Sequence, residues 1–130
     1  MKISSVVCCE SIAQDLGNKT VITAPIQVFK LINIPSMYSF SVSVGLVDVD
    51  KHGKDLFSMS ILDPNGVIVN KIESMNLPIP PDEILNSESS YGLNINLDIR
   101  NLIFNQVGTY TLLVYEGDNI ISESYFVVAL

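Results

Sequence analysis

The fold of this chain is decided by the stretch Gly92–Asn101, which has the sequence GLNINLDIRN. Apolar and polar residues alternate along it in the order Leu93, Asn94, Ile95, Asn96, Leu97, Asp98, Ile99, Arg100. Successive side chains of a strand point to opposite faces of a sheet, so this stretch has one apolar face and one polar face. The pattern predicts an antiparallel strand with its apolar face buried and its polar face in water.

The stretch Tyr38–Val49 has the same period of two residues. Its apolar positions are Phe40, Val42, Val44 and Leu46, and the positions between them include Ser39, Ser41 and Ser43. We therefore predict a second strand of the same kind. The two apolar stripes are expected to face one core.

Six further segments are rich in β-branched and aromatic residues and are bounded by turn signals. They are Ile3–Cys9, Thr20–Ala24, Leu56–Leu62, Val67–Lys71, Thr109–Tyr115 and Ile120–Val128. The tetrapeptide Asp63–Gly66 (DPNG) between two of them is a strong hairpin signal, and a second turn is expected at Glu116–Asn119. About eight strands of this kind predict an all-β fold, an antiparallel two-sheet β-sandwich that is immunoglobulin-like or jelly-roll-like. Residues 1–130 are expected to form a single β-sandwich domain.

Helical signals are weak, and at most two short helices are expected. One helical turn is predicted at Ser11–Leu16 and another at Pro81–Asn86, where proline and acids open the segment. The longest segment without strand character is Glu73–Ser90, because its three prolines cannot pair regularly in a sheet. A loop of this length is often functional.

The residues Gly108-Thr109-Tyr110 open a strand late in the chain. In immunoglobulin-like sandwiches, a tyrosine near such a corner hydrogen-bonds to the backbone a few residues upstream. We therefore predict that Tyr110 makes this bond and places its ring in the core.

Composition excludes several classes of protein and partner. Of 130 residues, 48% are apolar and only 16% are charged, which is unlike a disordered tail. Seven basic and fourteen acidic residues give a net charge of −7, so nucleic acid and anionic membranes are not expected as direct partners. No stretch resembles a membrane span or a secretory signal. We therefore expect an acidic, cytoplasmic protein.

The two cysteines, Cys8 and Cys9, are adjacent. Adjacent Cα atoms lie about 3.8 Å apart, which is below the usual range for a disulfide. On a strand the two side chains also point to opposite faces. We therefore expect reduced thiols that serve in packing.

No catalytic or metal-binding motif is present. His52 is the only histidine, and neither a nucleophile elbow nor a phosphate-binding glycine loop occurs. Asp48, Asp50 and Asp55 could offer oxygen ligands to Ca²⁺, but their spacing does not follow the EF-hand pattern. A solvated loop is the simpler interpretation, so no enzyme activity, metal or cofactor is expected.

Several short motifs together carry a family likeness. They are Val7-Cys8-Cys9-Glu10, Gly17-Asn18-Lys19-Thr20, Ile34-Pro35, Phe40-Ser41-Val42, Asp63-Pro64-Asn65-Gly66 and Val107-Gly108-Thr109-Tyr110. With these motifs the chain resembles a family of small uncharacterised bacterial and phage-associated β-sandwich proteins, known only as a domain of unknown function. The resemblance spans nearly the whole chain. It implies a compact β-sandwich and implies neither a reaction nor any functional residues.

Three residues are candidates for ligand binding. Arg100 is the only arginine, and its guanidinium suits a carboxylate or phosphate, although a surface ion pair is the commoner role. Tyr91 and Tyr125 could stack on a base or another ring, although aromatic residues in sandwiches are usually part of the core. Tyr91 opens its strand beside the proline-rich loop.

Two functions from different classes remain open. The first is a non-enzymatic interaction module that binds a protein partner and itself. The second is a small-molecule binder that sequesters a nucleotide signal, for example a phage-encoded inhibitor of host defence. The strand Ile120–Val128 has Ile121, Tyr125 and Val127 on one side and Ile120, Phe126 and Val128 on the other. Apolar residues on both sides predict that both faces are covered, so we expect a homodimer at micromolar concentration.

Overall fold

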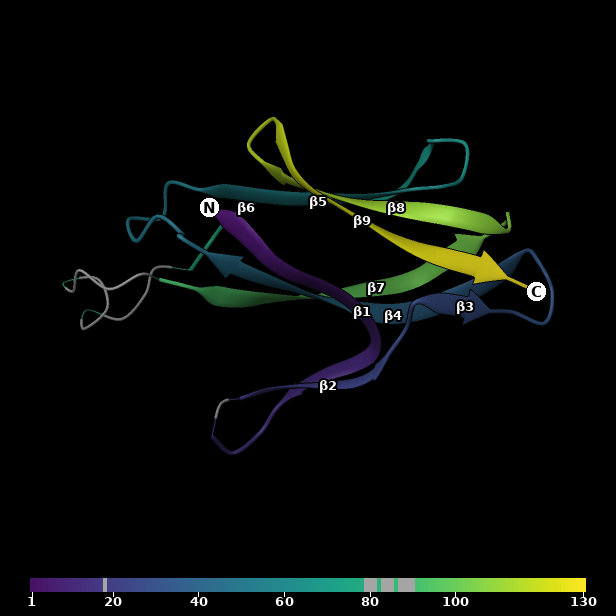
Figure 1. Cartoon of the computed structure of the whole chain (residues 1–130), viewed down its shortest axis with the longest axis horizontal. Coiled ribbons are helices and arrows are strands. Elements are labelled where there is room, and N and C mark those ends of the chain that lie inside the picture. Colours follow the sequence, from purple (N-terminus) through teal and green to yellow (C-terminus); the bar gives the residue numbers. More distant parts are fainter. Residues whose placement is uncertain (18, 79–81, 83–85, 87–90) are drawn as a thin grey trace.

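The structure is a computed structural model that describes residues 1–17, 19–78, 82, 86 and 91–130. Its described residues form nine strands in two sheets packed face to face (Figure 1). The strands are β1 (Lys2–Gln14), β2 (Thr20–Pro25), β3 (Val28–Lys30), β4 (Ser36–Val47), β5 (Leu56–Leu62), β6 (Ile68–Asn76), β7 (Leu93–Phe104), β8 (Gly108–Glu116) and β9 (Asn119–Ala129). Sheet I has the order β2-β1-β4-β7, and sheet II has the order β3-β9-β8-β5-β6. The predicted all-β, two-sheet sandwich is confirmed.

The strand order is that of an immunoglobulin-like sandwich. In that fold, strands A, B and E are neighbours in one sheet, and strands G, F, C and C′ are neighbours in the other. Here β1, β4 and β7 occupy the first set of positions, and β9, β8, β5 and β6 occupy the second. The correspondence follows the order of the chain, and it distinguishes the immunoglobulin-like alternative from the jelly roll.

The two predicted apolar stripes line the core between the sheets. Strands β4 and β7 pair antiparallel, with Val42 opposite Leu97 and Val44 opposite Ile95. On β4 the whole stripe is buried, and on β7 the burial deepens from the half-exposed Leu93 to Ile99. Strand β4 ends at Val47, earlier than predicted, and the next residue, Asp48, has a φ of 53°.

Strand β7 contains a β-bulge and continues beyond Asn101, which was its predicted end. Between the pairs Phe40–Ile99 and Tyr38–Leu102, β7 has two residues where β4 has only Ser39. Asn101 takes up the extra length with a φ of 56°, and its backbone N–H donates to Ser39 Oγ at 2.9 Å. The extra residue keeps Leu102 in the core, and the strand continues to Phe104.

Two local predictions are confirmed in detail. Tyr110 is fully buried, and its hydroxyl donates to the Gln106 carbonyl at 3.1 Å, which completes the predicted tyrosine corner. The β5–β6 connection is the predicted turn. Asp63 Oδ1 accepts the backbone N–H groups of Asn65 and Val67 at 2.9 Å each, and Gly66 has a φ of 81°.

The predicted helical turn at Ser11–Leu16 is wrong. Strand β1 continues to Gln14, because Ser11 to Gln14 pair with β2 in an antiparallel hairpin. Residues Lys2–Cys9 of β1 pair with β4, and Figure 1 shows β1 then bending away, so that the β1–β2 hairpin projects from the sandwich. Pairing with a neighbouring strand outweighs the weak helical preference of this segment.

The short strand β3 was not expected from the sequence. Val28–Lys30 pairs parallel with β9 and moves the chain from sheet I to sheet II. Phe29 points into the core with 1% of its surface exposed, and Val28 and Lys30 point outward. Three residues show too little alternation to stand out in a sequence.

The segment Glu73–Ser90 begins as strand rather than loop, because β6 pairs with β5 as far as Asn76. The predicted helical turn at Pro81–Asn86 lies mostly outside the described residues. Between its two described members, the Asn86 N–H donates to the Asp82 carbonyl at 2.9 Å. In the described part of the chain, no helix has the length and hydropathy required to cross a bilayer.

In the part of the chain that the structure describes, the carboxy-terminal strand β9 is covered on only one of its two faces, whereas the sequence predicted that both would be covered. A bulge between the pairs Val114–Ser122 and Tyr115–Ile120 turns Ile121 towards the core and leaves Ile120 54% exposed. Phe126 and Val128 are buried as expected. The opposite side of β9 has no cover within the described residues of this chain.

The cysteines lie on opposite sides of β1, as predicted. Cys8 is part of the core, and Cys9 lies on the other side, where its thiol donates to the Ser41 carbonyl at 3.6 Å. Both are free and buried. Burial raises the pKa of Cys8 to about 12 and also raises the pKa of Cys9, so both thiols are held in their neutral form.

Candidate functional site

The outer face of sheet II carries a row of side chains that crosses four strands. Tyr125 of β9 lies opposite Thr111 of β8, Thr111 opposite Leu62 of β5, and Leu62 opposite Ile68 of β6. Residues that pair across antiparallel strands project from the same face of the sheet. We call these four residues the apolar row.

The two ends of the apolar row are exposed, with 61% of Tyr125 and 53% of Ile68 accessible. Beside Tyr125, Val28 of β3 pairs with Val127 of β9, and these two are 51% and 37% exposed. Single exposed apolar residues are common, but a contiguous patch marks a surface that gains free energy when it is covered.

A second row runs next to the first. It consists of Glu123 (β9), Leu113 (β8), Ser60 (β5) and Lys71 (β6), which pair in that order across the four strands. We call it the charged row, because its two ends are an exposed carboxylate and an exposed ammonium group. Its centre is closed, with Leu113 8% and Ser60 1% exposed. The Ser60 hydroxyl shares a 3.0 Å hydrogen bond with the Tyr115 hydroxyl, so the buried polar group is satisfied.

Tyr125 and Glu123 connect the two rows on β9. The Tyr125 hydroxyl donates to Glu123 Oε2 at 3.0 Å. This hydrogen bond to a carboxylate, together with its negative charge, raises the pKa of Tyr125. The phenol therefore stays neutral at physiological pH and presents a ring with a fixed polar tip.

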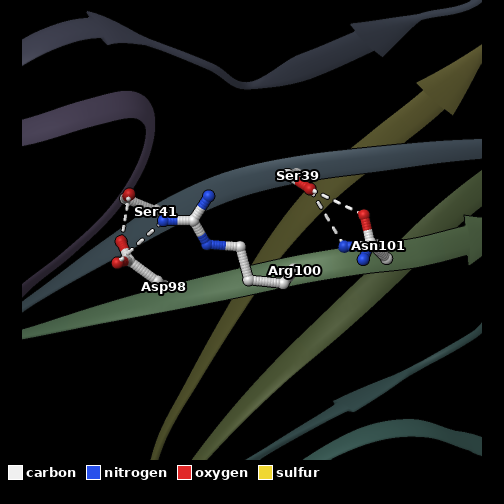
Figure 2. Close-up of polar contacts among 5 residues, drawn as sticks. All are labelled: Ser39, Ser41, Asp98, Arg100 and Asn101. Atoms are coloured by element: carbon white, nitrogen blue, oxygen red, sulfur yellow. Dashed lines mark hydrogen bonds and ion pairs between the residues drawn. The ribbon is translucent and has the colours of Figure 1, made fainter.

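The outer face of sheet I is different in character. Figure 2 shows a chain of polar contacts in which the Ser41 hydroxyl donates to Asp98 Oδ1 at 2.9 Å, and Arg100 donates to the other carboxylate oxygen at 3.4 Å. Beside it, Ser39 and Asn101 are joined by the contacts of the bulge. These polar groups largely satisfy one another.

An open hollow of about 310 Å³ lies over this polar cluster, between sheet I and the β1–β2 hairpin. The hairpin contributes Glu10, Ser11 and Ile12, and the sheet contributes Ser39, Phe40, Ser41, Asp98 and Arg100. The Arg100 side chain is 74% exposed, and the carboxylates of Glu10 and Asp98 partly cancel its charge. An exposed ion pair of this kind contributes little to stability.

The structure does not bring the three predicted ligand-binding residues together. Arg100 lies on the outer face of sheet I and Tyr125 on the outer face of sheet II. Tyr91 is half-buried two residues before β7, where it packs against the core and its carbonyl accepts the Val49 N–H at 3.2 Å. Val28, Ile68, Lys71 and Glu123 were not singled out from the sequence, because only the pairing register places them beside Tyr125.

The acidic loop between β4 and β5 uses its carboxylates internally. Asp50 Oδ1 accepts the His52 N–H at 2.8 Å, and Asp55 Oδ2 accepts the Asp50 N–H at 2.8 Å. Asp48 forms an exposed ion pair with Lys2 at 3.6 Å. Among the residues that the structure describes, no three His, Cys, Asp or Glu side chains gather as a metal site requires.

Comparisons with known proteins place the chain in a family. The model titled "Family of unknown function (DUF6941)" matches residues 4–129. The chain belongs to this family. A comparison with curated proteins finds no match for this DUF6941 member. Among solved structures, the DUF6941 chain is similar to an immunoglobulin-like protein from Pseudomonas aeruginosa, with 14% sequence identity and a TM-score of 0.45. That match covers 98% of this chain and 94% of the other.

Proposed function

We propose that this DUF6941 protein is a non-enzymatic interaction module that binds a protein through the outer face of sheet II. The observation that carries the proposal is the apolar row with its neighbours Val28 and Val127. Immunoglobulin-like sandwiches host many unrelated functions, so this surface, and not the fold, supports the proposal.

The chemistry of the face favours a protein over a small molecule. Its exposed apolar side chains come from separate strands of a sheet, and charged side chains flank them. Protein interfaces are enriched in aromatic residues and have polar rims, whereas small-molecule sites are concave and mostly apolar. The hollow of about 230 Å³ beside Ile68 and Lys71 on this face is open and is lined mainly by polar residues. Tyrosine is among the residues that most often dominate the binding free energy of an interface.

A non-enzymatic role is part of the same proposal. His52 is the only histidine, and it is exposed in the loop between β4 and β5. Cys8 and Cys9 are buried, and burial raises the pKa of both thiols, which disfavours the reactive thiolate. The expected cytoplasmic location stays a prediction, and so does the association with phages.

Site-specific photo-crosslinking in the cells that express the protein tests the proposal. A benzophenone amino acid replaces Tyr125 in one variant and the equally outward Thr23 of β2 in a control. We expect a crosslinked protein adduct from position 125 and none from position 23. The adduct can contain a second copy of the chain or another protein. A position 125 variant that is folded, expressed and free of adducts refutes the proposal.

The hollow at Arg100 supports a second candidate, the binding of a small anionic molecule such as a nucleotide. It combines a guanidinium, hydroxyl groups and the apolar Ile12 over about 310 Å³. Because the carboxylates of Glu10 and Asp98 also line it, an anion would have to displace Asp98 from Arg100. Native mass spectrometry of protein purified from its host would then show a retained small mass. Because the three sequence candidates lie apart, Arg100→Ala should release that mass, while Tyr125→Ala should not. A mass-free parent protein would rule this candidate out.

A further inference from the structure

The charged row places opposite charges at the two ends of one line across sheet II. Glu123 on β9 and Lys71 on β6 are separated by β8 and β5. Three strand spacings of about 4.8 Å put them roughly 14 Å apart, which is too far for an ion pair within one copy. The arrangement therefore has an acidic and a basic end on the same exposed face.

We propose that this face packs against the same face of a second copy, about a two-fold axis that runs parallel to the strands between β8 and β5. This inference rests on the proposed function and names its partner. The axis places β9 of each copy over β6 of the other, so that Glu123 meets the partner's Lys71 and Lys71 meets the partner's Glu123. Sheets that pack face to face keep their strands within about 30° of each other, which agrees with an axis of this direction.

The alternative axis in the interface plane is disfavoured by charge. An axis that runs along the charged row would place Glu123 against the partner's Glu123 and Lys71 against the partner's Lys71. Like charges in contact are strongly unfavourable, and each copy already has a net charge of −7. Only the strand-parallel axis converts the two ends of the charged row into two ion pairs.

The same axis also brings the apolar rows of the two copies into contact. The strand-parallel axis places Tyr125 over the partner's Ile68, and Thr111 over the partner's Leu62. The most exposed apolar side chains at the two ends of the row then cover each other. At the centre, Ser60 is already hydrogen-bonded to Tyr115, so covering it leaves no unsatisfied hydroxyl.

The size of the face agrees with a stable dimer. Four strands at about 4.8 Å spacing are roughly 19 Å wide. The 9-residue strand β8 at about 3.4 Å per residue gives a length of roughly 30 Å. The flat area of the face is therefore about 600 Å². Side chains that project from the sheet raise the accessible area above this value, towards the roughly 800 Å² per partner of a typical stable interface.

Charge reversal on the purified full chain tests this geometry by sedimentation. We expect Glu123→Lys and Lys71→Glu each to raise the dimer Kd at least about tenfold, because each variant brings like charges together twice. The double variant should restore the Kd to within about threefold of the parent. An equimolar mixture of the two single variants should form a heterodimer, because all its contacts pair opposite charges. Lys54→Glu, an exposed reversal in the loop between β4 and β5, is the control and should leave the Kd unchanged.

Three outcomes would overturn the proposal. The first is a 14.3 kDa monomer at high concentration. The second is a dimer that the single reversals leave intact, since that dimer uses another surface. The third is a pair of weakened single variants that neither the double variant nor the mixture rescues. If the chain is monomeric while position 125 still crosslinks to a different protein, the interaction module stands and the symmetric dimer does not.

Discussion

Replacement of Phe29 tests whether this one side chain, on the short strand β3, holds β3 against the core of the sandwich. The Phe29 ring lies 5.1 Å from Tyr38, 4.8 Å from Phe40, 5.4 Å from Phe104 and 5.0 Å from Phe126, measured between ring centroids. Two of these contacts, those with Tyr38 and Phe126, are edge-to-face, a geometry that favours aromatic pairs. With 1% exposure, the whole side chain contributes to the core.

Removal of this ring in Phe29→Ala should lower the free energy of unfolding by about 4 kcal/mol, the middle of the range for buried phenylalanines. A chain of 130 residues has a total stability of roughly 6–20 kcal/mol, so the variant is expected to fold. Urea unfolding measures the loss. With an m value of about 2 kcal/mol/M, the midpoint should fall by about 2 M.

A matched control comes from the same strand. Lys30 is exposed beside Phe29, and Lys30→Ala should change the free energy of unfolding by less than about 0.5 kcal/mol. Phe29→Leu keeps most of the volume but loses the ring contacts, so an intermediate loss of about 1–2 kcal/mol is expected. If Phe29→Ala shifts the midpoint by less than about 0.5 M, Phe29 is not the anchor and the aromatic cluster is not the centre of the core.

Three further predictions concern the fold and the thiols. Tyr110→Phe removes only the hydroxyl of the tyrosine corner and should cost about 1 kcal/mol in a urea titration, and an unchanged midpoint would contradict the corner. Gly108→Ala places a side chain at a φ of 131° against Pro64 and should cost more than about 1 kcal/mol, so equal stability would refute the strained backbone. Because the pKa of Cys8 is raised from 9.0 to about 12, its contribution to stability is fully present below pH 9 and is lost as the pH rises from 9 to 12. The melting temperature should therefore fall over that range, with a smaller fall in Cys8→Ala, and folded protein at pH 8 should not react with a thiol reagent.

Much of the fold could be predicted because its signals are local. The alternation in β4 and β7 requires only the period of a pleated strand, and the turn at Asp63–Gly66 requires only residues that fit its backbone angles. Tyr110 could be placed because the corner connects it to a carbonyl four positions upstream. In each case, the interacting groups lie close together in the sequence or repeat with a fixed period.

The features that were missed depend on partners far away in the sequence. Strand β3 is three residues long and is defined by its pairing with the distant β9. Ser11–Gln14 becomes strand only because β2 pairs with it. The bulge at Arg100 and Asn101 is the exception, because the sequence contains its signal. The apolar spacing changes from two residues to three between Ile99 and Leu102, and such a change indicates an inserted residue.

The candidate site likewise contains a residue that the sequence could identify and neighbours that it could not. Tyr125 could be chosen from the sequence because apolar residues occur on both sides of its strand. Its neighbours could not be named, since the apolar row joins positions 62, 68, 111 and 125 through three separate strand registers. A shift of one residue in any of these registers would turn a neighbour to the other face of the sheet.

The two outer faces and the edges of the sandwich together indicate where association is favourable. On sheet I, polar groups of β4 and β7 bond to each other, as Ser41 does with Asp98. The exposed large apolar side chains of these two strands lie near their ends, with the pair Met37 and Ile103 at one end and Val47 at the other. Two of the four edge strands offer little for strand pairing, because β7 is interrupted by its bulge and β3 is very short. On sheet II, apolar side chains are exposed beside an acidic and a basic end that cannot meet within one copy. Covering this face removes apolar surface from water and brings its opposite charges together, and both gains favour association through sheet II.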